Sequence, residues 1–324
     1  MILRVIVPVL AGLWLTTPTA PAAAQTWPSK PIRWIVPYPP GGITDAVTRL
    51  VASRLQEALG QPVVIENRPG SNSIIGSEAL ATAAPDGATF GTVIAAYAAN
   101  ATLYAGKLPF DTEQSFAPVS LVGIAPLILT TNLAFPPKDM KELVAYAKAD
   151  PGKISFGSSG IGSAAHLTTE LLKQTIGADM QHIPYKGTAP ALQGLIGGEI
   201  QILVDVPSSL MPQVRGGKIR GLAMFSAARL PSATEIPTIV EAGGPAIESS
   251  TWVILLAPAR TPADIVARIS TEVGRIVAQP DMRSRFEAQG IEPVGSSPAE
   301  AATFLGREIA KWAKVITAAD VKPE

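Results

Sequence analysis

The sequence contains no cysteine and only two histidines, His166 and His182. Without cysteine, a disulfide framework, a zinc–thiolate site and a cysteine nucleophile are excluded, and two histidines argue against a multi-histidine metal centre. We therefore expect neither a bound metal nor a cofactor.

Charge is scarce as well. Charged residues make up 16% of the 324 residues, and 26 basic side chains balance 26 acidic ones. Because there is no basic excess to neutralise phosphates, we do not expect a nucleic-acid partner. The apolar share of 47% excludes a disordered chain. Aromatic residues are few, but 28 glycines and 30 prolines indicate many turns between short elements, as alternating strand–helix folds require.

The first 24 residues have the pattern of a secretory signal peptide. Arg4 is their single positive charge, residues 5–15 are apolar, and three alanines stand at positions 22–24 as a cleavage site. The apolar run is shorter than the ~20 residues that span a membrane, and prolines interrupt the segment. The sequence therefore predicts export to the periplasm through a cleavable signal.

Strand, turn and helix alternate along the rest of the chain, which predicts an α/β protein. Short connections and right-handed crossovers favour parallel sheets for such a pattern. The first unit is predicted to have strands over residues 31–37, 62–66 and 89–95 and helices over 46–59 and 74–84. The second is predicted to have helices over 138–149, 167–175 and 189–196 and strands over 153–156, 180–184, 200–204 and 219–225.

The C-terminal region is predicted to be helical over residues 263–278, 280–288 and 298–318, with no strand of its own. These helices must cover an existing sheet, most simply the first one, so the chain has to cross between two units twice.

Apolar segments at 121–130 and 249–257 fit these crossings. The prediction is a two-lobed binding-protein shape with two parallel-rich sheets flanked by helices. Lobe I comprises residues 25–124 and 250–324, and lobe II comprises 125–249. Ligands of open α/β sheets bind at the carboxyl ends of strands.

The segment PYPPGGITD, residues 37–45, connects the first predicted strand to its helix. Free amides at a helix N-terminus and the positive end of the helix dipole favour a bound anion. The two glycines allow the backbone to approach a ligand closely. Asp45 either caps its helix or pairs with an ammonium group. The candidate ligand-binding residues here are Tyr38, Pro40, Gly41, Gly42, Thr44 and Asp45.

The segment FGSSGIGSAAH, residues 156–166, occupies the equivalent corner of the second unit. Its glycines match a dinucleotide fingerprint, but the next strand runs into PYK instead of an acidic ribose-binding residue. The nucleophile pattern G-x-S-x-G fails at Ile161. A glycine/serine anion cradle remains, and His166 either packs beside it or contacts ligand. The candidate residues are Ser158, Ser159, Gly160, Gly162, Ser163 and His166.

Four other strand ends supply weaker candidates. Ser71 lies in NRPGSNS after the second strand, as either a cleft residue or part of a solvated turn. Ala95 and Ala96 are predicted to end the third strand and to leave room for a ligand. Asp205 either reaches the cleft through water or caps the following helix. Tyr185 and Lys186 follow another strand, and Lys186 serves either the cleft or the surface.

Five stretches together resemble the extracytoplasmic solute-binding receptors of tripartite tricarboxylate transporters, often called Bug proteins. They are PSKPIRWIVPYPPGGITDAVTRLVA, VVIENRPGSNSIIGSEALATAAPDGATF, ISFGSSGIGSAAHLTTELL, HIPYKGTAPALQGLIGGEI and TWVILLAPARTPADIV. The resemblance implies a type II periplasmic-binding (Venus-flytrap) fold that closes around a small carboxylate without transforming it. It also implies that PYPPGGITD and GSSGIGS hold this carboxylate through backbone amides and bridging waters.

The chain departs from the family's pattern in one loop. Many relatives read N-R-P-G-A-G-G where this chain has Ser71, Asn72 and Ser73 after the first glycine. The change adds polar side chains and bulk.

The leading hypothesis is a monomeric periplasmic receptor for an organic, amino or aromatic acid, which it delivers to a membrane permease. One alternative is a ligand-sensing subunit that acts on a signalling partner. Another is a periplasmic hydrolase or lyase that uses Asp45, His166 and Lys186. The sequence shows no carboxylate pair and no base–nucleophile dyad, so we do not expect an enzyme.

Overall fold

The computed structural model describes residues 27–323. The predicted signal peptide, residues 1–24, lies outside the described residues. Among the residues that are described, none of the helices combines the length and apolar character needed to cross a membrane.

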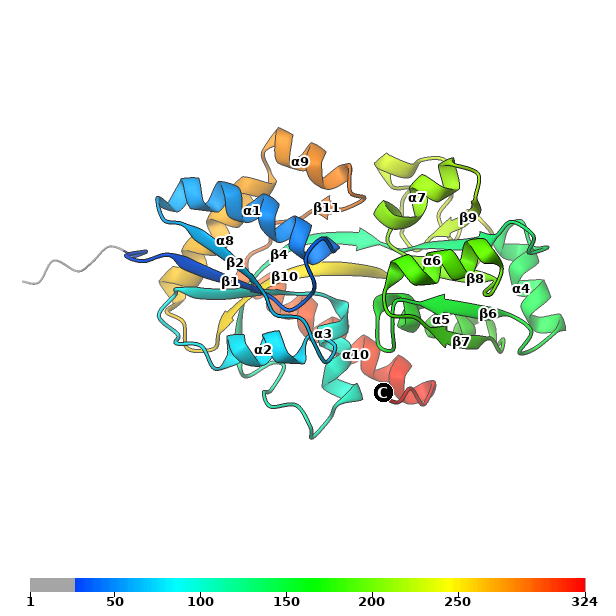
Figure 1. Cartoon of the computed structure of the whole chain (residues 1–324), viewed down its shortest axis with the longest axis horizontal. Helices are drawn as coiled ribbons and strands as arrows, with labels where there is room; N and C mark the ends of the chain where they lie inside the picture. Colours follow the sequence, from blue (N-terminus) through cyan, green and yellow to red (C-terminus); the bar gives the residue numbers. More distant parts are fainter. Residues whose placement is uncertain (1–26, 324) are drawn as a thin grey trace, which may run out of the picture.

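Two sheets form the framework, one in each half of the molecule (Figure 1). In spatial order, the first contains β11 (Glu292–Pro293), β4 (Phe116–Pro126), β10 (Ser250–Pro258), β3 (Thr89–Val93), β1 (Ile32–Val36) and β2 (Val63–Asn67). The second contains β7 (Gln181–Pro184), β6 (Ser155–Ser158), β8 (Ile202–Asp205), β5 (Ile128–Asn132) and β9 (Ile219–Met224).

Each sheet is mixed, which corrects the expectation of parallel-rich sheets. In the first, β1 pairs in parallel with β2 and β3, whereas β10 is antiparallel to β3 and β4. In the second, β6 pairs in parallel with β7 and β8, whereas β5 is antiparallel to β8 and β9. Each antiparallel pair among the described strands includes β4, β5 or β10, the strands at the two crossings.

The two crossings are long strands that run between the halves of the molecule (Figure 1). The chain passes from β4 into β5 at Leu127 and returns from the second half into β10 at Ser250. This confirms the predicted α/β fold with two sheets joined by two crossings. The lobe boundaries proposed from the sequence stay a prediction.

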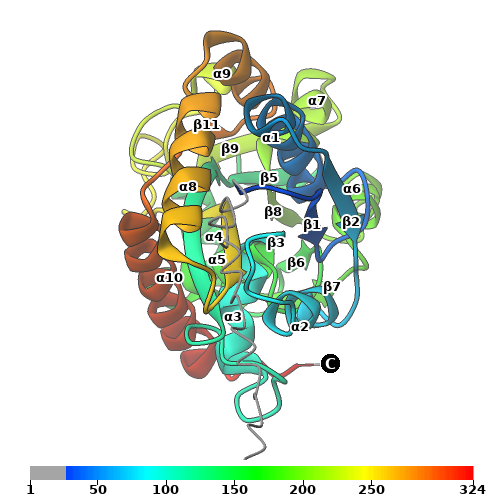
Figure 2. The same cartoon turned by 90° about the vertical axis from the view of Figure 1, so that its left-hand side faces the viewer.

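Helices cover both faces of the first sheet (Figures 1 and 2). Helices α1 (Ile43–Leu59) and α8 (Ala263–Val277) pack together on one face, and α9 (Pro280–Glu287) follows them. Helices α2 (Ile74–Ala81), α3 (Ala95–Leu103) and α10 (Pro298–Ala318) cover the other face. Alternation along β10 explains the two cores, since Val253 and Leu255 belong to one and Ile254 and Leu256 to the other.

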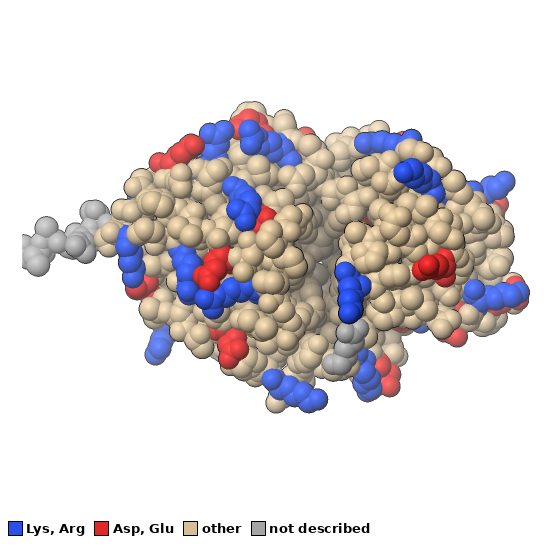
Figure 3. Space-filling model, in the orientation of Figure 1, with Lys and Arg blue, Asp and Glu red and all other residues tan. Residues whose placement is uncertain are grey.

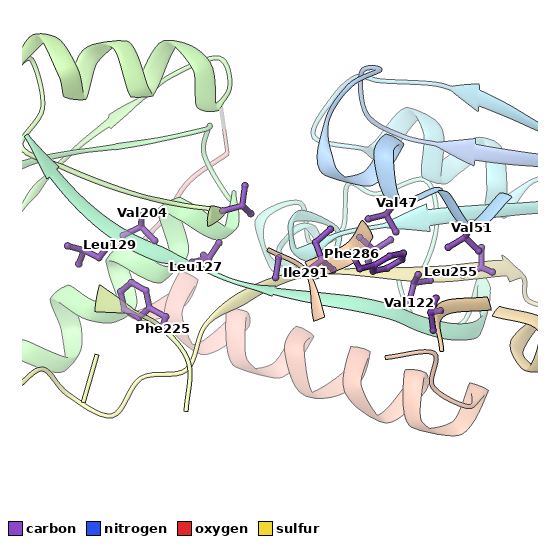
Figure 4. Close-up of a cluster of buried hydrophobic side chains, with 14 of the residues drawn as sticks. Val47, Val51, Val122, Leu127, Leu129, Val204, Phe225, Leu255, Phe286 and Ile291 are labelled. Atoms are coloured by element: carbon purple, nitrogen blue, oxygen red, sulfur yellow. The ribbon is translucent and has the colours of Figure 1, made fainter. Parts of the chain in front are cut away.

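The second sheet is flanked by four helices. They are α4 (Met140–Ala149), α5 (Ala164–Ile176), α6 (Thr188–Gly197) and α7 (Pro207–Arg215). Helices α6 and α7 share a core with Ile128 and Leu203, whereas Leu143 of α4 and Leu172 of α5 belong to the core that continues into the first half. Figure 4 shows Leu127, at the crossing, between the buried side chains of the two halves.

The sequence analysis missed helix α3 and strand β11. Residues 95–103 form helix α3, so Ala95 and Ala96 begin a helix and do not end a strand. This Ala-rich segment has strong intrinsic helix propensity. The C-terminal region also contributes a strand, β11, whose two residues pair with β4. The expected packing of the C-terminal helices on the first sheet is confirmed, and α10 also reaches α5, where the Gln174 side chain donates to the Val315 carbonyl at 3.2 Å.

Candidate functional site

A cavity of about 950 Å³ lies between the two sheets. Figure 3 shows the molecule hollowed between its halves, with mostly uncharged surface on either side. Its lining comes from both halves and from the crossings, where Leu127 and Thr251 contribute. Within the described residues, Lys186 and Asp205 are the charged side chains that line it.

The N-termini of five helices border this cavity. Each contributes its N-cap residue together with residues of its first turn. The lining residues are Gly42, Ile43, Thr44 and Ala46 for α1; Ile94, Ala95 and Ala96 for α3; Ser163, Ala164 and Ala165 for α5; Gly187, Thr188, Ala189 and Pro190 for α6; and Val206, Ser208 and Ser209 for α7. First-turn amides lack carbonyl partners within their helix, and the dipole makes this end positive.

The corner before α1 is shaped by Gly41 and held by Asp45. Gly41 has φ +86°, a conformation that is strained for a residue with a side chain, although a Cβ added there would meet open space. Asp45 Oδ2 accepts from the Gly41 amide at 3.0 Å and from Arg49 Nε at 2.9 Å, and Asp45 Oδ1 accepts from Asn67 Nδ2 at 2.9 Å. These donors, Arg49 foremost, lower the pKa of Asp45 to about 2. Asp45 does not line the cavity, and it is not the N-cap of α1, which is Gly42; it holds the amide of Gly41, the residue before the N-cap.

The corner before α5 repeats this arrangement with a different side chain. Ser163 is the N-cap residue, and its Oγ accepts from the His166 amide at 3.2 Å. His166 Nδ1 in turn accepts from the Gly162 amide at 3.1 Å. His166 therefore holds the loop without lining the cavity, whereas Ser159 and Ser163 line it.

The two histidines stack on each other behind this corner. Their ring centroids lie 3.7 Å apart with an interplanar angle of 10°, and the Phe156 ring lies 4.9 Å from that of His182 and 6.2 Å from that of His166. His182 Nε2 lies 2.7 Å from Ser158 Oγ, which is itself bonded to the backbone of Gly160. Burial is the main cause that lowers the pKa of His166 to about 3 and that of His182 to about 4. Both rings are neutral near pH 7.

The hydrolase alternative requires Asp45, His166 and Lys186 to meet. Of these, Lys186 lines the cavity, whereas Asp45 and His166 are buried behind their loops. The three side chains do not converge on one point of the lining.

Asp205 lies at the end of β8 and lines the cavity, although it is 6% exposed. Its Oδ2 accepts from Thr188 Oγ1 at 2.8 Å, and its Oδ1 accepts from the Val206 amide at 2.8 Å. Burial raises its pKa, which these two donors partly oppose. The capping alternative is wrong, because the N-cap of α7 is Val206 and no side chain caps this helix; Asp205 bonds the amide of the N-cap residue itself. Contact with the cleft through water stays a prediction.

The loop that departs from the family's pattern is strained. Ser71, Asn72 and Ser73 have φ values of 46°, 51° and 76°, a region that non-glycine residues rarely adopt. Asn100 stabilises the loop, because Asn72 Nδ2 donates to Asn100 Oδ1 and Asn100 Nδ2 donates to the Asn72 carbonyl, each at 2.7 Å. Asn72 lines the cavity, whereas Ser71 does not.

The predicted site residues thus divide into two groups. Those that line the cavity are Tyr38, Pro40, Gly41, Gly42, Thr44, Ala95, Ala96, Ser159, Ser163, Lys186 and Asp205. Those outside its lining are Asp45, Ser71, Ser158, Gly160, Gly162, His166 and Tyr185. Tyr185 instead donates its hydroxyl hydrogen to Glu199 Oε2 at 3.2 Å.

Sequence reasoning missed several residues of the lining, notably Asn72, Thr188, Ser208 and Ser209. The last three lie in the first turns of α6 and α7, which follow β7 and β8. The strand-to-helix rule that found the first two corners could have found these as well.

Comparison with known proteins agrees with this geometry. The family model described as the tripartite tricarboxylate transporter family receptor matches residues 47–321. Protein BugT of Bordetella pertussis is 36% identical over 312 residues, which cover 94% of each chain.

Solved structures extend the comparison to the fold. Rpa4515 of R. palustris, solved with adipate, is 34% identical with a TM-score of 0.83, over 92% of this chain and 100% of that one. MatC of Rhodopseudomonas palustris, solved with bound malate, is 31% identical with a TM-score of 0.78, over 90% and 100%. The chain belongs to the receptor family of tripartite tricarboxylate transporters, a family of periplasmic solute-binding proteins.

Proposed function

We propose that this receptor captures a small carboxylate between lobe I, residues 25–124 and 250–324, and lobe II, residues 125–249. The observation that carries the proposal is the ring of five helix N-termini around a cavity with two charged side chains in its lining. Each N-terminus is equivalent to roughly half a positive charge. An anion in this cavity is therefore attracted without a bidentate arginine.

The ligand's carboxylate lies between the first turns of α1 and α5. Gly42, Ile43 and Thr44 offer amides from lobe I, and Ala164 and Ala165 offer them from lobe II. Each hydrogen bond to a charged group contributes roughly 1.5–3 kcal/mol. A few such bonds offset the desolvation of the ligand and account for the ~8 kcal/mol that micromolar affinity requires. The adipate and malate complexes of two relatives support this ligand class.

The proposal includes export and delivery. Residues 1–24 direct the chain to the periplasm as a cleavable signal, and the mature receptor, a monomer, passes its ligand to the membrane permease of a tripartite tricarboxylate-type transporter. Membership of the receptor family supports this partner.

Calorimetric titration of the chain without residues 1–24 tests the proposal. The titrants are mono- and dicarboxylic acids of two to six carbons, their hydroxy and amino derivatives, and aromatic acids. At least one is expected to bind with micromolar or tighter affinity. Binding of no acid, with no acid retained in native mass spectrometry, would contradict the proposal.

A matched pair of variants localises the binding. Gly42→Val places a branched side chain on the lining of the cavity and is expected to abolish binding with an unchanged circular dichroism spectrum. Gly197→Val, the same substitution at an exposed glycine with open space around it, is expected to bind as the wild type does. Equal affinity in both variants would show that the α1 corner does not hold the ligand.

A further inference from the structure

Asp205 is an unusual group for a cavity that attracts anions. It is a carboxylate with 6% of its surface exposed, and it lines the same wall as the first turns of α6 and α7. The negative charge of Asp205 would repel a ligand carboxylate placed directly against it. Asp205 therefore constrains which part of a ligand lies next to it.

The protein satisfies Asp205 only in part. Thr188 Oγ1 donates to one of its oxygens and the Val206 amide to the other, so each oxygen has one protein donor. Two carboxylate oxygens accept about four hydrogen bonds. Within residues 27–323 no salt bridge engages Asp205, and Lys186, which lines the same cavity, is not paired with it.

The start of α7 favours the charged form of Asp205, against the burial that opposes it. Its bond to the Val206 amide places it at the N-terminus of α7, where the helix dipole favours a negative group. A buried carboxylate without a cation is costly unless its remaining lone pairs meet donors. A donor supplied by the ligand meets this requirement and displaces water from the wall.

We infer that Asp205 recognises a hydrogen-bond donor, an ammonium or a hydroxyl group, on the bound acid. The inference rests on the proposed function, since the ligand's carboxylate must lie at the α1 and α5 N-termini for its donor to reach Asp205. The ligand is then an amino or hydroxy acid, and Asp205 discriminates it from the unsubstituted acid of the same length.

Matched ligand series test the inference. Each contains an unsubstituted acid, its 2-hydroxy derivative and its 2-amino derivative: propionate, lactate and alanine; succinate, malate and aspartate; glutarate, 2-hydroxyglutarate and glutamate; adipate, 2-hydroxyadipate and 2-aminoadipate. In at least one series the hydroxy or amino acid is expected to bind the wild type about 10-fold or more tightly than its parent, a difference of about 1.4 kcal/mol. A ratio below 10-fold in every series overturns the inference. The two derivatives distinguish a hydroxyl from an ammonium ligand.

Asp205→Asn removes the charge but keeps the shape. The preference for the substituted acid is expected to fall at least 10-fold in this variant, while the unsubstituted acid binds as well as before or better. Asp179→Asn, the same change at an exposed residue of the second half, is the control and keeps the wild-type ratio. An unchanged ratio in Asp205→Asn overturns the inference. If Asp205→Asn does not fold, the wild-type ratios decide alone.

The outcomes separate the inference from the proposed function. Binding of no acid in any series, together with failure of the wider acid screen, contradicts the proposed function itself. Tight binding of unsubstituted acids without preference for their derivatives overturns the role of Asp205 and leaves carboxylate capture intact.

Discussion

The corners that begin α1 and α5 share one plan and differ in chemistry. In each, the third residue of the helix accepts a hydrogen bond from the amide just before the N-cap. Asp45 accepts from Gly41 at 3.0 Å, and His166 Nδ1 accepts from Gly162 at 3.1 Å. One acceptor is a carboxylate and the other a neutral imidazole. The loop therefore requires an acceptor at this position but not a negative charge.

The surroundings of the two acceptors explain the choice. Asp45 pairs with Arg49, whose side chain is 52% exposed, so its charge is compensated at the surface. His166 stacks with His182 and Phe156, and Glu170 Oε1 lies 3.9 Å from its Nε2; burial nevertheless makes a charge on the His166 ring costly. The two corners are consequently expected to respond to acid at different pH values.

Acid is expected to weaken the α5 corner first, and this is the largest effect. Burial lowers the pKa of His166 to about 3 and that of His182 to about 4, from 6.5, so the unfolded chain takes up protons that the folded chain excludes. The stability from these two rings is complete above pH 6.5 and declines as the pH falls. Between pH 7 and pH 4.5 the loss is expected to be on the order of a few kcal/mol. Urea denaturation at several pH values measures it.

A double variant isolates this contribution. In His166→Gln with His182→Phe, glutamine keeps an acceptor for the Gly162 amide and phenylalanine keeps the ring stack. The stability of this variant is expected to change much less between pH 7 and pH 4.5. The same slope in both proteins would assign the acid response to other groups.

Substitution of the glycines in the two corners is expected to have the next largest effect. Gly41 and Gly162 both have positive φ, so alanine costs about 1–2 kcal/mol at either position. At Gly162 the new Cβ would also lie 2.5 Å from Leu103 Cδ1 of α3, in the other half of the molecule. Overpacking adds about 1–3 kcal/mol. Gly162→Ala is expected to lose more stability and more ligand affinity than Gly41→Ala.

The contact between a side chain at position 162 and Leu103 can be tested by shortening Leu103. Adding Leu103→Ala to Gly162→Ala removes the clashing methyl group and is expected to restore affinity to the level of the Leu103→Ala single variant. If affinity stays low, the backbone strain at Gly162, and not contact with α3, is responsible.

Removal of the Asp45 charge is expected to have a smaller effect. A pKa of about 2, against 3.8, means that Asp45→Asn loses about 2 kcal/mol at pH 7. The stability from this carboxylate is present above pH 3.8 and is lost as the pH falls toward 2, so the gap to the wild type should close there. Denaturation at pH 7 and pH 3 measures this. Asp86→Asn, at a surface ion pair with Lys30, serves as a control and should lose less than about 1 kcal/mol.

The smallest effect is expected for Arg49→Ala. Arg49 is the main cause of the low pKa of Asp45, but water and salt screen its exposed guanidinium. We expect a loss below about 1 kcal/mol, which shrinks further in 1 M salt. A loss as large as that of Asp45→Asn would show that the ion pair, and not the Gly41 bond, holds the corner.

Local signals allowed much of the fold to be predicted. Helix α10 has the predicted bounds, and its start is readable in the sequence, because Ser297 and Glu300 form a capping box and Pro298 occupies the first helical position. The prediction was wrong where tertiary context decides: β11 has two residues and exists through its pairing with β4. In residues 95–103 the local signal was present, because their alanines favour a helix, but the start of this segment was interpreted as the end of a strand.

The site was predictable to a similar extent. Gly41 and Ser163 could be placed near a ligand because a glycine-rich turn before a helix is visible in one segment. Thr188 begins helix α6, which follows β7, and Asp205 ends strand β8. Their hydrogen bond depends on the order β7-β6-β8 in the second sheet. The residues of a single segment do not predict that strand order.

The sequence by itself determined the class of protein, the two crossings and the two glycine-rich corners, because helix caps, turns and strand periodicity act over a few neighbouring residues. Only the tertiary structure decided that five helices aim their N-termini at one cavity, that Asp45 and His166 stand behind the loops, and that Asp205 faces the cavity. These facts depend on strand order and on packing between segments far apart in the chain, which local propensities do not encode.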